Sequence, residues 1–419
     1  MAYPDELTAE TGSGNRAGHG SDPQHPALLA YRARTRRSMS IYAGALVLIL
    51  LLTFVVIKVI YAHGELTKVS RLTAPAPATI AITPTAERLS LRWRSTDRPA
   101  GGNPYSSGIV VTYAGHTVNG RDALTGAVRW HYTRSDEDVC DVVQQDQSTI
   151  AFYNRDGNCD EVTAFVTATG EPKWYRTLTD DGRLSVSSAP NVVLVVSDTT
   201  VHVFDNAGGI DRWAWAAPNG CIVDRALGGT NGVLASYHCG TTNHLMVHDL
   251  TTGAEVPRWT ITVATPFVPV AAGTLLAAAS ATTGRVQIFS ADKGVAGAFV
   301  SVGDPSTVRA QLPALSRSQT TTESFDAKGR VFELVRLEAV FCLNSVGRTL
   351  WSAPSDQAPT VIDGDQVATA RGATLVLHTL TTGRPTKTVT LTGRSTVGAR
   401  VFEVSSGLVI AGTTTEMYS

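Results

Sequence analysis

Two hydrophobic patterns divide the chain. The first is one apolar run from Ile41 to Ala62, which reads IYAGALVLILLLTFVVIKVIYA and contains Lys58 as its only charge. In a helix these 22 residues would reach roughly 30 Å, the thickness of a bilayer's hydrocarbon core. The second pattern fills most of the remaining chain, with short alternating apolar stretches separated by turns rich in Gly, Thr and Asp, which is typical of strands. We therefore expect one transmembrane helix followed by an all-β domain.

The charges that flank the apolar run predict its orientation. Four arginines stand within residues 32–37, whereas Lys68 and Arg71 are the basic residues at a comparable distance on the other side. The excess of basic residues before the run places the N-terminus in the cytoplasm and everything after about residue 63 outside. A cleavable signal peptide is the alternative, but the run is longer than the usual 7–15-residue apolar region and Ile60-Tyr61-Ala62 is a poor cleavage site. We expect a single-pass protein of the cytoplasmic membrane.

The composition around the helix predicts the remaining domain boundaries. Residues 1–40 lack apolar periodicity and end in the arginine cluster, which indicates a disordered cytoplasmic tail. Residues 63–86 are rich in Thr, Ala and Pro and are expected to be an extracytoplasmic linker. Residues 87–419 then form the β domain.

One phrase recurs through the β domain, with its stronger copies about 40 residues apart. It reads DALTGAVRW up to Trp130, VTATGEPKW up to Trp174, DNAGGIDRW up to Trp213 and DLTTGAEVPRW up to Trp259. In each copy a strand leads into a turn whose Gly supplies a positive φ, and the next strand ends in a Trp that can bury against a neighbouring unit. The Trp residues expected to dock neighbouring units are Trp93, Trp130, Trp174, Trp213, Trp259 and Trp351.

This Asp/Ala-x-x-Thr-Gly-x-x-x-Trp phrase resembles the tryptophan-docking repeat of quinoprotein-like (PQQ-like) propellers, a family that includes the pyrroloquinoline-quinone dehydrogenases and BamB. The resemblance covers about residues 87–419 and implies a β-propeller. Counting the copies gives eight blades, with seven as the alternative because the copy near Phe299 is degenerate. Leu89–Trp93 is an orphan Trp strand and Gly407–Gly412 begins a blade that has no Trp strand. We therefore expect the two stretches to complete one blade and close the ring.

Four of the five cysteines form a duplicated pattern. Cys140 and Cys159 are 19 residues apart in the second blade, and Cys221 and Cys239 are 18 apart in the fourth. The matched spacing outside the cytoplasm predicts two disulfides, each between adjacent strands of one blade. Four buried thiols are the alternative. Cys342 is left over and is expected to be a buried strand residue without a disulfide.

Three further segments could carry chemistry, and each has a simpler interpretation. The stretch Asn154–Asp160 places oxygen side chains on alternate positions as calcium loops do, but an Asp-Gly hairpin turn explains it with less. His238, Cys239, His244 and His248 could suggest zinc, although the alternating context favours histidines on strand faces. The polar insert Ser316–Arg330 is either a functional loop or one without a role. We expect no bound metal and no cofactor.

The sequence is more informative about what this chain lacks than about its ligand. It contains no G-x-S-x-G, H-E-x-x-H or P-loop motif, and it lacks the adjacent Cys-Cys pair of the quinone dehydrogenases. A formal net charge of -1 argues against nucleic acid as a partner. We hypothesise a non-catalytic, extracytoplasmic binding or scaffolding module whose partners are proteins of the cell envelope. The alternative is a small-ligand or metal sensor, or a quinone-dependent enzyme, that uses the propeller channel.

Overall fold

The computed structural model describes residues 42–56 and 68–419, apart from gaps at 78–86, 156, 179–183, 254–256, 274, 281, 283–285, 301–323, 328–329, 336–338, 345–347, 357–358, 363–364, 394–399 and 405–406. The chain divides into two compact units, Met1–Thr67 and Lys68–Ser419.

The first unit contains a helix over residues 42–56. Its apolar side chains from Leu46 to Leu52 and from Phe54 to Val56 each expose more than half of their surface. Within the described part of the chain, no helix is both long and apolar enough to cross a membrane. The predicted transmembrane helix over 41–62 is therefore not supported by this part, and residues 41 and 57–62 lie outside it. The predicted tail, residues 1–40, lies outside it as well.

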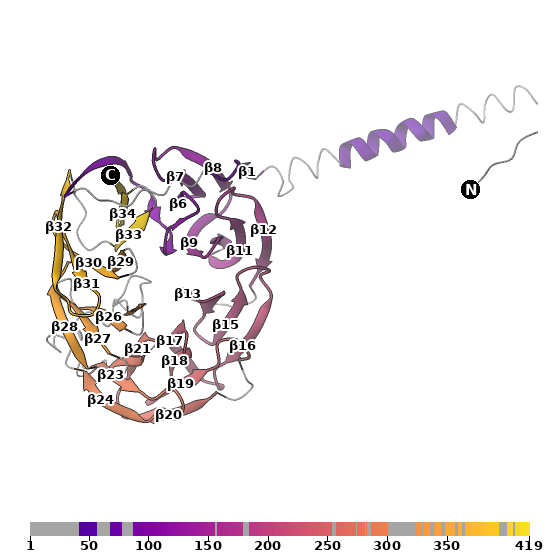
Figure 1. The fold of residues 1–419 in the computed structure, drawn as a ribbon. Coiled ribbons are helices and arrows are strands. Elements are labelled where there is room, and N and C mark those ends of the chain that lie inside the picture. The colour runs from indigo at the N-terminus through magenta and orange to yellow at the C-terminus, as the bar shows by residue number, and fades with distance from the viewer. Residues whose placement is uncertain are drawn as a thin grey trace, which may run out of the picture. The chain divides into compact units, whose positions relative to one another are not determined.

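The second unit is all-β, and its antiparallel sheets succeed one another around a ring (Figure 1). The described strands form seven hydrogen-bonded sheets. The first contains β1 (Val69–Leu72), β8 (Val128–Arg134), β7 (Thr117–Asp122), β6 (Ile109–Ala114), β3 (Arg98–Pro99) and β5 (Tyr105–Ser106). The second contains β12 (Pro172–Thr177), β11 (Asn158–Val166), β10 (Ser148–Arg155), β9 (Asp138–Gln145) and β4 (Gly101–Gly102).

Four sheets of four consecutive strands follow in chain order. They are β13 (Ser185–Ala189), β14 (Val192–Val196), β15 (Thr200–Asp205) and β16 (Asp211–Ala216); β17 (Cys221–Gly229), β18 (Gly232–Cys239), β19 (Thr242–His248) and β20 (Trp259–Val263); β21 (Phe267–Ala271), β22 (Leu276–Ser280), β23 (Val286–Phe289) and β24 (Ala296–Val300); and β25 (Ser324–Ala327), β26 (Arg330–Val335), β27 (Ala339–Leu343) and β28 (Thr349–Pro354). Of the predicted polar insert, residues 316–323 and 328–329 lie outside the described residues.

The last sheet joins the two ends of the second unit. Its order is β29 (Thr360–Ile362), β30 (Gln366–Arg371), β31 (Thr374–Thr379), β32 (Pro385–Thr392), β2 (Arg88–Ser95), β35 (Thr415–Tyr418), β34 (Gly407–Ala411) and β33 (Arg400–Val404). The N-terminal β2 pairs antiparallel with the C-terminal β35, with Leu91 opposite Tyr418. Through β35, the predicted stretches 89–93 and 407–412 join one sheet, as expected from the sequence. The Arg94 guanidinium lies 2.8 Å from the fully buried Glu416 carboxylate across the same junction.

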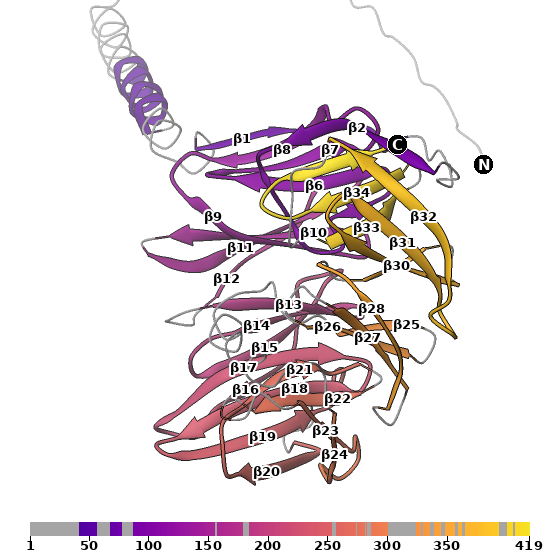
Figure 2. The same cartoon turned by 90° about the vertical axis from the view of Figure 1, so that its left-hand side faces the viewer.

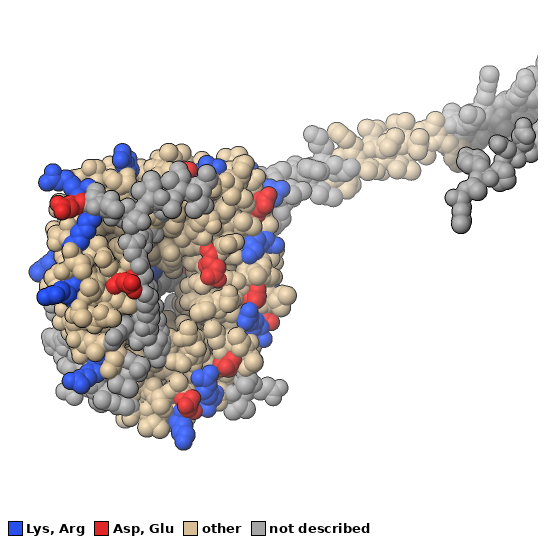
Figure 3. All heavy atoms as spheres, viewed as in Figure 1, with Lys and Arg blue, Asp and Glu red and all other residues tan. Residues whose placement is uncertain are grey.

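The core consists of apolar layers between consecutive sheets, which are stacked when seen from the side (Figure 2). Between the β6–β8 strands and the β9–β12 strands, for example, Trp130, Tyr132, Tyr153 and Phe165 pack together. A sheet that is apolar on both faces cannot be stable alone, so each sheet depends on its neighbours. At the centre of the ring the described surface is hollowed, with acidic and basic side chains both spread around it (Figure 3).

Two short segments depart from the regular pattern. Within the predicted linker 63–86, β1 pairs along β8, so part of the linker belongs to the first sheet. Farther along, β4 leaves the first sheet and pairs in parallel with β9 of the next. Gly102 has φ +74°, and a Cβ there would lie 2.6 Å from the Gln144 carbonyl oxygen. Only glycine fits this close approach.

Candidate functional site

The repeated phrase folds locally as a turn that is built by its aspartate. The Asp122 Oδ1 accepts hydrogen bonds from the backbone N–H groups of Leu124 and Thr125, both at 3.0 Å. The Gly126 N–H then donates to the Asp122 carbonyl at 2.8 Å, with Gly126 at φ +72°. Asp249 makes the same kind of turn, and its backbone hydrogen bonds, that of Thr252 first, lower the pKa of its carboxyl group. The turn chemistry therefore fixes where the following Trp strand begins.

Each repeat Trp reaches from one sheet to the turn of the next. The Trp130 indole Nε1 donates to the Thr167 carbonyl at 2.8 Å, and its ring lies where a Cβ on Gly170 would stand 2.6 Å away. The same contact recurs around the ring. The donor and acceptor pairs are Trp93 to Ala123, Trp174 to Asn206, Trp213 to Leu250, Trp259 to Ala291 and Trp351 to Leu380, at 2.9–3.3 Å. These side chains are engaged in joining sheets.

Both predicted disulfides are present. Cys221 and Cys239 lie directly opposite each other on β17 and β18, with Cα atoms 4.2 Å apart. Cys140 and Cys159 are also bonded, with Cα atoms 6.1 Å apart. They do not lie on adjacent strands as predicted, because β10 lies between β9 and β11. The ladder register shifts near each of them, which lets the bridge pass one end of β10.

The other metal and thiol candidates do not assemble into a site. Cys342 is buried in β27 and forms no disulfide. Cys239 is consumed by its disulfide, and His238 pairs with Asp224 at 2.9 Å. His244 stacks on Tyr237 and thus lies on the face of the sheet opposite to His238.

His248 is buried beside Trp213. The stretch Asn154–Asp160 spans the turn between β10 and β11, in agreement with the hairpin interpretation. In the described segments no three His, Cys, Asp or Glu side chains are grouped so as to hold a metal ion.

A buried charge cluster connects the first two sheets. The Arg134 guanidinium lies 2.7 Å from the Glu137 carboxylate and 4.0 Å from that of Glu161. The Thr177 hydroxyl donates to the other Glu161 oxygen at 3.0 Å. Because all three charged side chains are almost fully buried, their mutual pairing offsets part of their desolvation. The cluster therefore has a structural role in orienting the two sheets.

One carboxyl group has an unusual protonation equilibrium. Asp141 in β9 accepts a hydrogen bond from the Val142 N–H at 2.8 Å and a long one from the Tyr113 hydroxyl at 3.5 Å. Its second oxygen is buried and has no hydrogen-bond partner within the described segments. Burial raises the pKa of Asp141 to about 7 and that of Tyr113 to about 12. Asp141 can therefore exchange a proton near neutral pH.

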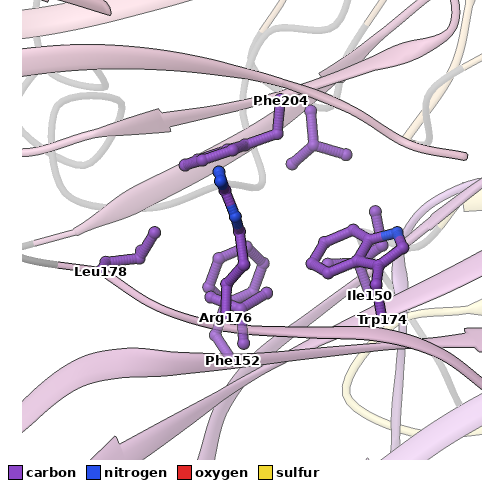
Figure 4. Close-up of a pocket in the computed structure, with 8 residues that line it drawn as sticks. Ile150, Phe152, Trp174, Arg176, Leu178 and Phe204 are labelled. Carbon is purple, nitrogen blue, oxygen red and sulfur yellow. The ribbon is translucent and has the colours of Figure 1, made fainter. Parts of the chain in front are cut away.

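An apolar recess lies between the β9–β12 and β13–β16 sheets (Figure 4). It is a small recess that is partly open to solvent. The Arg176 guanidinium extends across it to the face of Phe204 at 5.3 Å and pairs with the Asp211 carboxylate at 3.0 Å. The remaining lining residues are Ile150, Phe152, Val162, Trp174, Leu178 and Val193. The recess is therefore lined by apolar side chains and by one cation, which is paired with Asp211.

Sequence reasoning missed this recess and Asp141. The alternation of Trp174 and Arg176 in β12 with Leu178 just after it indicates that they share one face. The sequence carries no signal that Phe204, from another sheet, lies opposite them.

Comparison with known families accounts for the repeat. A family model described as "Outer membrane protein assembly factor BamB", built from PQQ-like repeats, matches residues 90–296. Residues 90–296 therefore belong to the PQQ-like repeat family. The matched range includes five of the repeat tryptophans. Both disulfides also lie within it. A comparison with curated proteins found no match.

Solved structures resemble this PQQ-like chain in fold at low identity. The designed protein Ika8 is 15% identical, with a TM-score of 0.54, and the match covers 80% of this chain and 100% of Ika8. BamB from Moraxella catarrhalis is 14% identical over 83% of this chain and 100% of BamB, with a TM-score of 0.48. Quinohemoprotein alcohol dehydrogenase from Comamonas testosteroni is 11% identical over 81% and 78%, with a TM-score of 0.49. The Ika8 likeness shows a shared fold alone.

Proposed function

We propose that this chain is a non-catalytic binding and scaffolding module of the cell envelope, which acts through contacts with other envelope proteins. The BamB-like propeller fold supports a protein-interaction scaffold in general terms. The observation that carries the proposal is that the residues of the repeat are engaged in joining sheets, as Trp130 and Gly170 are. A rigid ring built in this way presents its edges and loops to partners.

We further propose that the ring stands outside the cytoplasm and is anchored by residues 41–62. Two disulfides support an oxidising compartment, where such bonds persist. The exposed apolar side chains of the described helix, such as Leu50 and Phe54, support a lipid environment around it. Protease added to intact spheroplasts should then digest or release the region after residue 63. Protection of that region, with cleavage of the N-terminal tail instead, would contradict this topology.

We also propose a number of blades for the ring. We count eight, because the strands β29–β32 form one four-stranded unit and β33, β34, β35 and β2 form another within the last sheet. Among the described strands, a single backbone ladder joins these two groups of strands, the short parallel pairing in which Arg88 lies opposite Thr390. An experimental density map of the ring would test this count, and seven blades would refute it.

Crosslinking in intact membranes followed by affinity capture tests the scaffolding role. We expect envelope proteins to be captured by the wild-type chain and not by a chain that ends before residue 87. The alternative is a quinone-dependent enzyme or a small-ligand sensor in the channel. It predicts dehydrogenase activity with added quinone and Ca²⁺, or stoichiometric metal in the purified chain. Either result, without captured protein, would overturn the scaffolding proposal.

A further inference from the structure

The chain is bound to the ring before it enters the ring-closing strand β2. β1 pairs antiparallel along β8, the outer strand of the first sheet, with Val69 opposite Arg134 (Figure 2). The outer strands of five other sheets, β12, β16, β20, β24 and β28, stand at the ends of their strand orders. β8 therefore differs from these five because it carries an added strand, which the chain itself supplies.

Both ends of this added segment are fixed to the first sheet and the turn after it. At its start, the Ser135 N–H donates to the Lys68 carbonyl at 2.9 Å, and the Lys68 ammonium lies 2.8 Å from the Asp136 carboxylate. At its end, the Pro77 ring packs so closely on Gly108 that a Cβ there would lie 2.8 Å from the Pro77 Cγ.

The middle of the segment reaches a second sheet. The Ala74 N–H donates to the Thr169 carbonyl at 3.1 Å, in the turn just before β12. The Arg129 guanidinium on β8 donates to the Pro75 carbonyl at 2.9 Å. Residues 68–77 therefore form a continuous strap along two sheets, and we call this segment the strap.

The strap is held mainly through its backbone. In β1, the side chains of Ser70, Arg71 and Leu72 are exposed, whereas Val69 is partly buried against the core. Burial of apolar surface, the main source of folding stability, therefore contributes little here. The strap adds backbone hydrogen bonds to a sheet that its own core already holds together.

The strand that follows the strap in the chain is the one that closes the ring. β2 pairs with the C-terminal β35, and its Trp93 indole donates to the Ala123 carbonyl of the first sheet at 2.9 Å. Detachment of β2 would break both contacts and open the ring. A pull on the chain from its N-terminal side meets the strap before it meets β2, because Lys68 precedes Arg88 and is bound to a different sheet.

We propose that the strap is a strain-relief device. It bears tension that enters the ring from the residues before Lys68, and so it keeps β2 in place while the ring holds a partner. This rests on the proposed function, because an anchored scaffold is pulled between its anchor and its partner. Forced opening is governed by the rate of unfolding along the pulled path, so a ladder outside the ring delays opening while adding little to stability at rest.

The ladder supplies a matched pair of variants. The Ser135 N–H bonds to the Lys68 carbonyl, so the backbone groups of Lys68 point toward β8. By alternation those of Ser70 do the same, whereas those of Arg71 point away. Ser70→Pro removes a ladder N–H and should weaken the strap, while Arg71→Pro removes an outward one and should not. Ser70→Ala keeps the N–H and controls for the hydroxyl, which lies 3.3 Å from the His131 Nε2.

Optical tweezers measure the effect on the full chain in detergent, with one handle at the N-terminus and the other at the exposed Lys293. At a constant force that the wild-type ring withstands, Ser70→Pro should shorten the lifetime of the closed ring about tenfold or more. Arg71→Pro and Ser70→Ala should stay within about threefold of wild type. In the wild type, release of the strap should appear as a separate step of up to roughly 35 Å before the ring opens.

A second variant does not depend on a proline within a strand. Ala74→Pro removes the N–H that bonds to Thr169, in a segment that already contains Pro75 and Pro77. This variant is expected to fold even if Ser70→Pro does not, and it should shorten the lifetime of the closed ring about fivefold.

Two controls separate strain relief from ordinary stability. With the handles at Lys293 and Ser419, the pull enters through β35 and bypasses the strap, so all variants should have the same lifetime. In guanidinium without force, Ser70→Pro should unfold within about twofold of the wild-type rate.

Three results would overturn the proposal. They are an unchanged lifetime with both Ser70→Pro and Ala74→Pro, an equal shortening with Arg71→Pro, and an equal acceleration of unfolding without force. The last would make the strap an ordinary part of the fold. Because the tweezers supply their own force, a failed topology or capture experiment would refute the anchored scaffold and leave these lifetimes unchanged, so the two failures are distinguishable.

Discussion

The contact between Gly170 and Trp130 tests how consecutive sheets are held together. Gly170 has φ +74°, and a Cβ at this position would lie 2.6–2.7 Å from the Trp130 ring and its Cβ. Trp130 is fully buried, and its indole is fixed by the hydrogen bond to Thr167. Gly170→Ala therefore adds a methyl group to a site where neither the backbone nor the ring can yield easily.

The expected loss of stability has two parts. An alanine in the left-handed region costs about 1–2 kcal/mol relative to glycine, and the reduced entropy of the unfolded chain returns about 0.4–1 kcal/mol. Displacement of a packed ring adds about 1–3 kcal/mol. We expect Gly170→Ala to lower the free energy of unfolding by roughly 2–4 kcal/mol.

A variant at Gly115 separates the backbone cost from the cost of displacing the Trp130 ring. Gly115 has φ +52°, and a Cβ added there would have no neighbouring atom within 4 Å. Gly115→Ala should therefore show the backbone part alone, about 1 kcal/mol. In a Trp130→Ala background, where the ring is gone, Gly170→Ala should cost no more than Gly115→Ala does, because contacting residues are not additive.

Guanidinium denaturation followed by fluorescence measures these differences in the free energy of unfolding. The slope of that free energy against denaturant concentration is held constant across the variants. Equal losses for Gly170→Ala and Gly115→Ala would refute the reasoning, since they would mean that the ring moves freely. An undiminished cost of Gly170→Ala without the Trp130 ring would place the strain elsewhere.

Three other predictions concern buried groups. Burial raises the pKa of Asp141 from 3.8 to about 7. The stability that the protonated carboxyl group gives the folded state is therefore fully present below about pH 4 and is lost as the pH rises through 7. Asp141→Asn should raise the free energy of unfolding by roughly 2–4 kcal/mol at pH 8 and leave it unchanged at pH 4, as measured by melts at both pH values. Tyr153→Phe should be neutral or stabilising by up to ~1 kcal/mol in denaturant melts, because the buried hydroxyl has no hydrogen-bond partner in the described structure, and a loss above 1 kcal/mol would reveal a bond to water. Replacing Cys221 and Cys239 by alanine should lower the free energy of unfolding by about 3 kcal/mol and remove part of the sensitivity to reductant, whereas Cys342→Ala should leave that sensitivity unchanged.

The sequence by itself determined the features that depend on neighbouring residues in the chain. Asp122 and Gly126 encode their turn because the aspartate bonds to the next N–H groups and the glycine accepts a positive φ. The pairing of Cys221 with Cys239 was readable because a hairpin places residues at this spacing opposite each other. The closure through β2 and β35 was readable because two incomplete repeats stand at the ends of the β domain.

Only the tertiary structure decided which groups from different sheets meet. The disulfide of Cys140 and Cys159 passes the end of an intervening strand, which spacing alone does not reveal. The burial that shifts the pKa of Asp141 and the recess between Arg176 and Phe204 both arise from the stacking of sheets. A two-residue alternation tells which face a side chain shares, but the neighbour across that face is set by how two sheets pack.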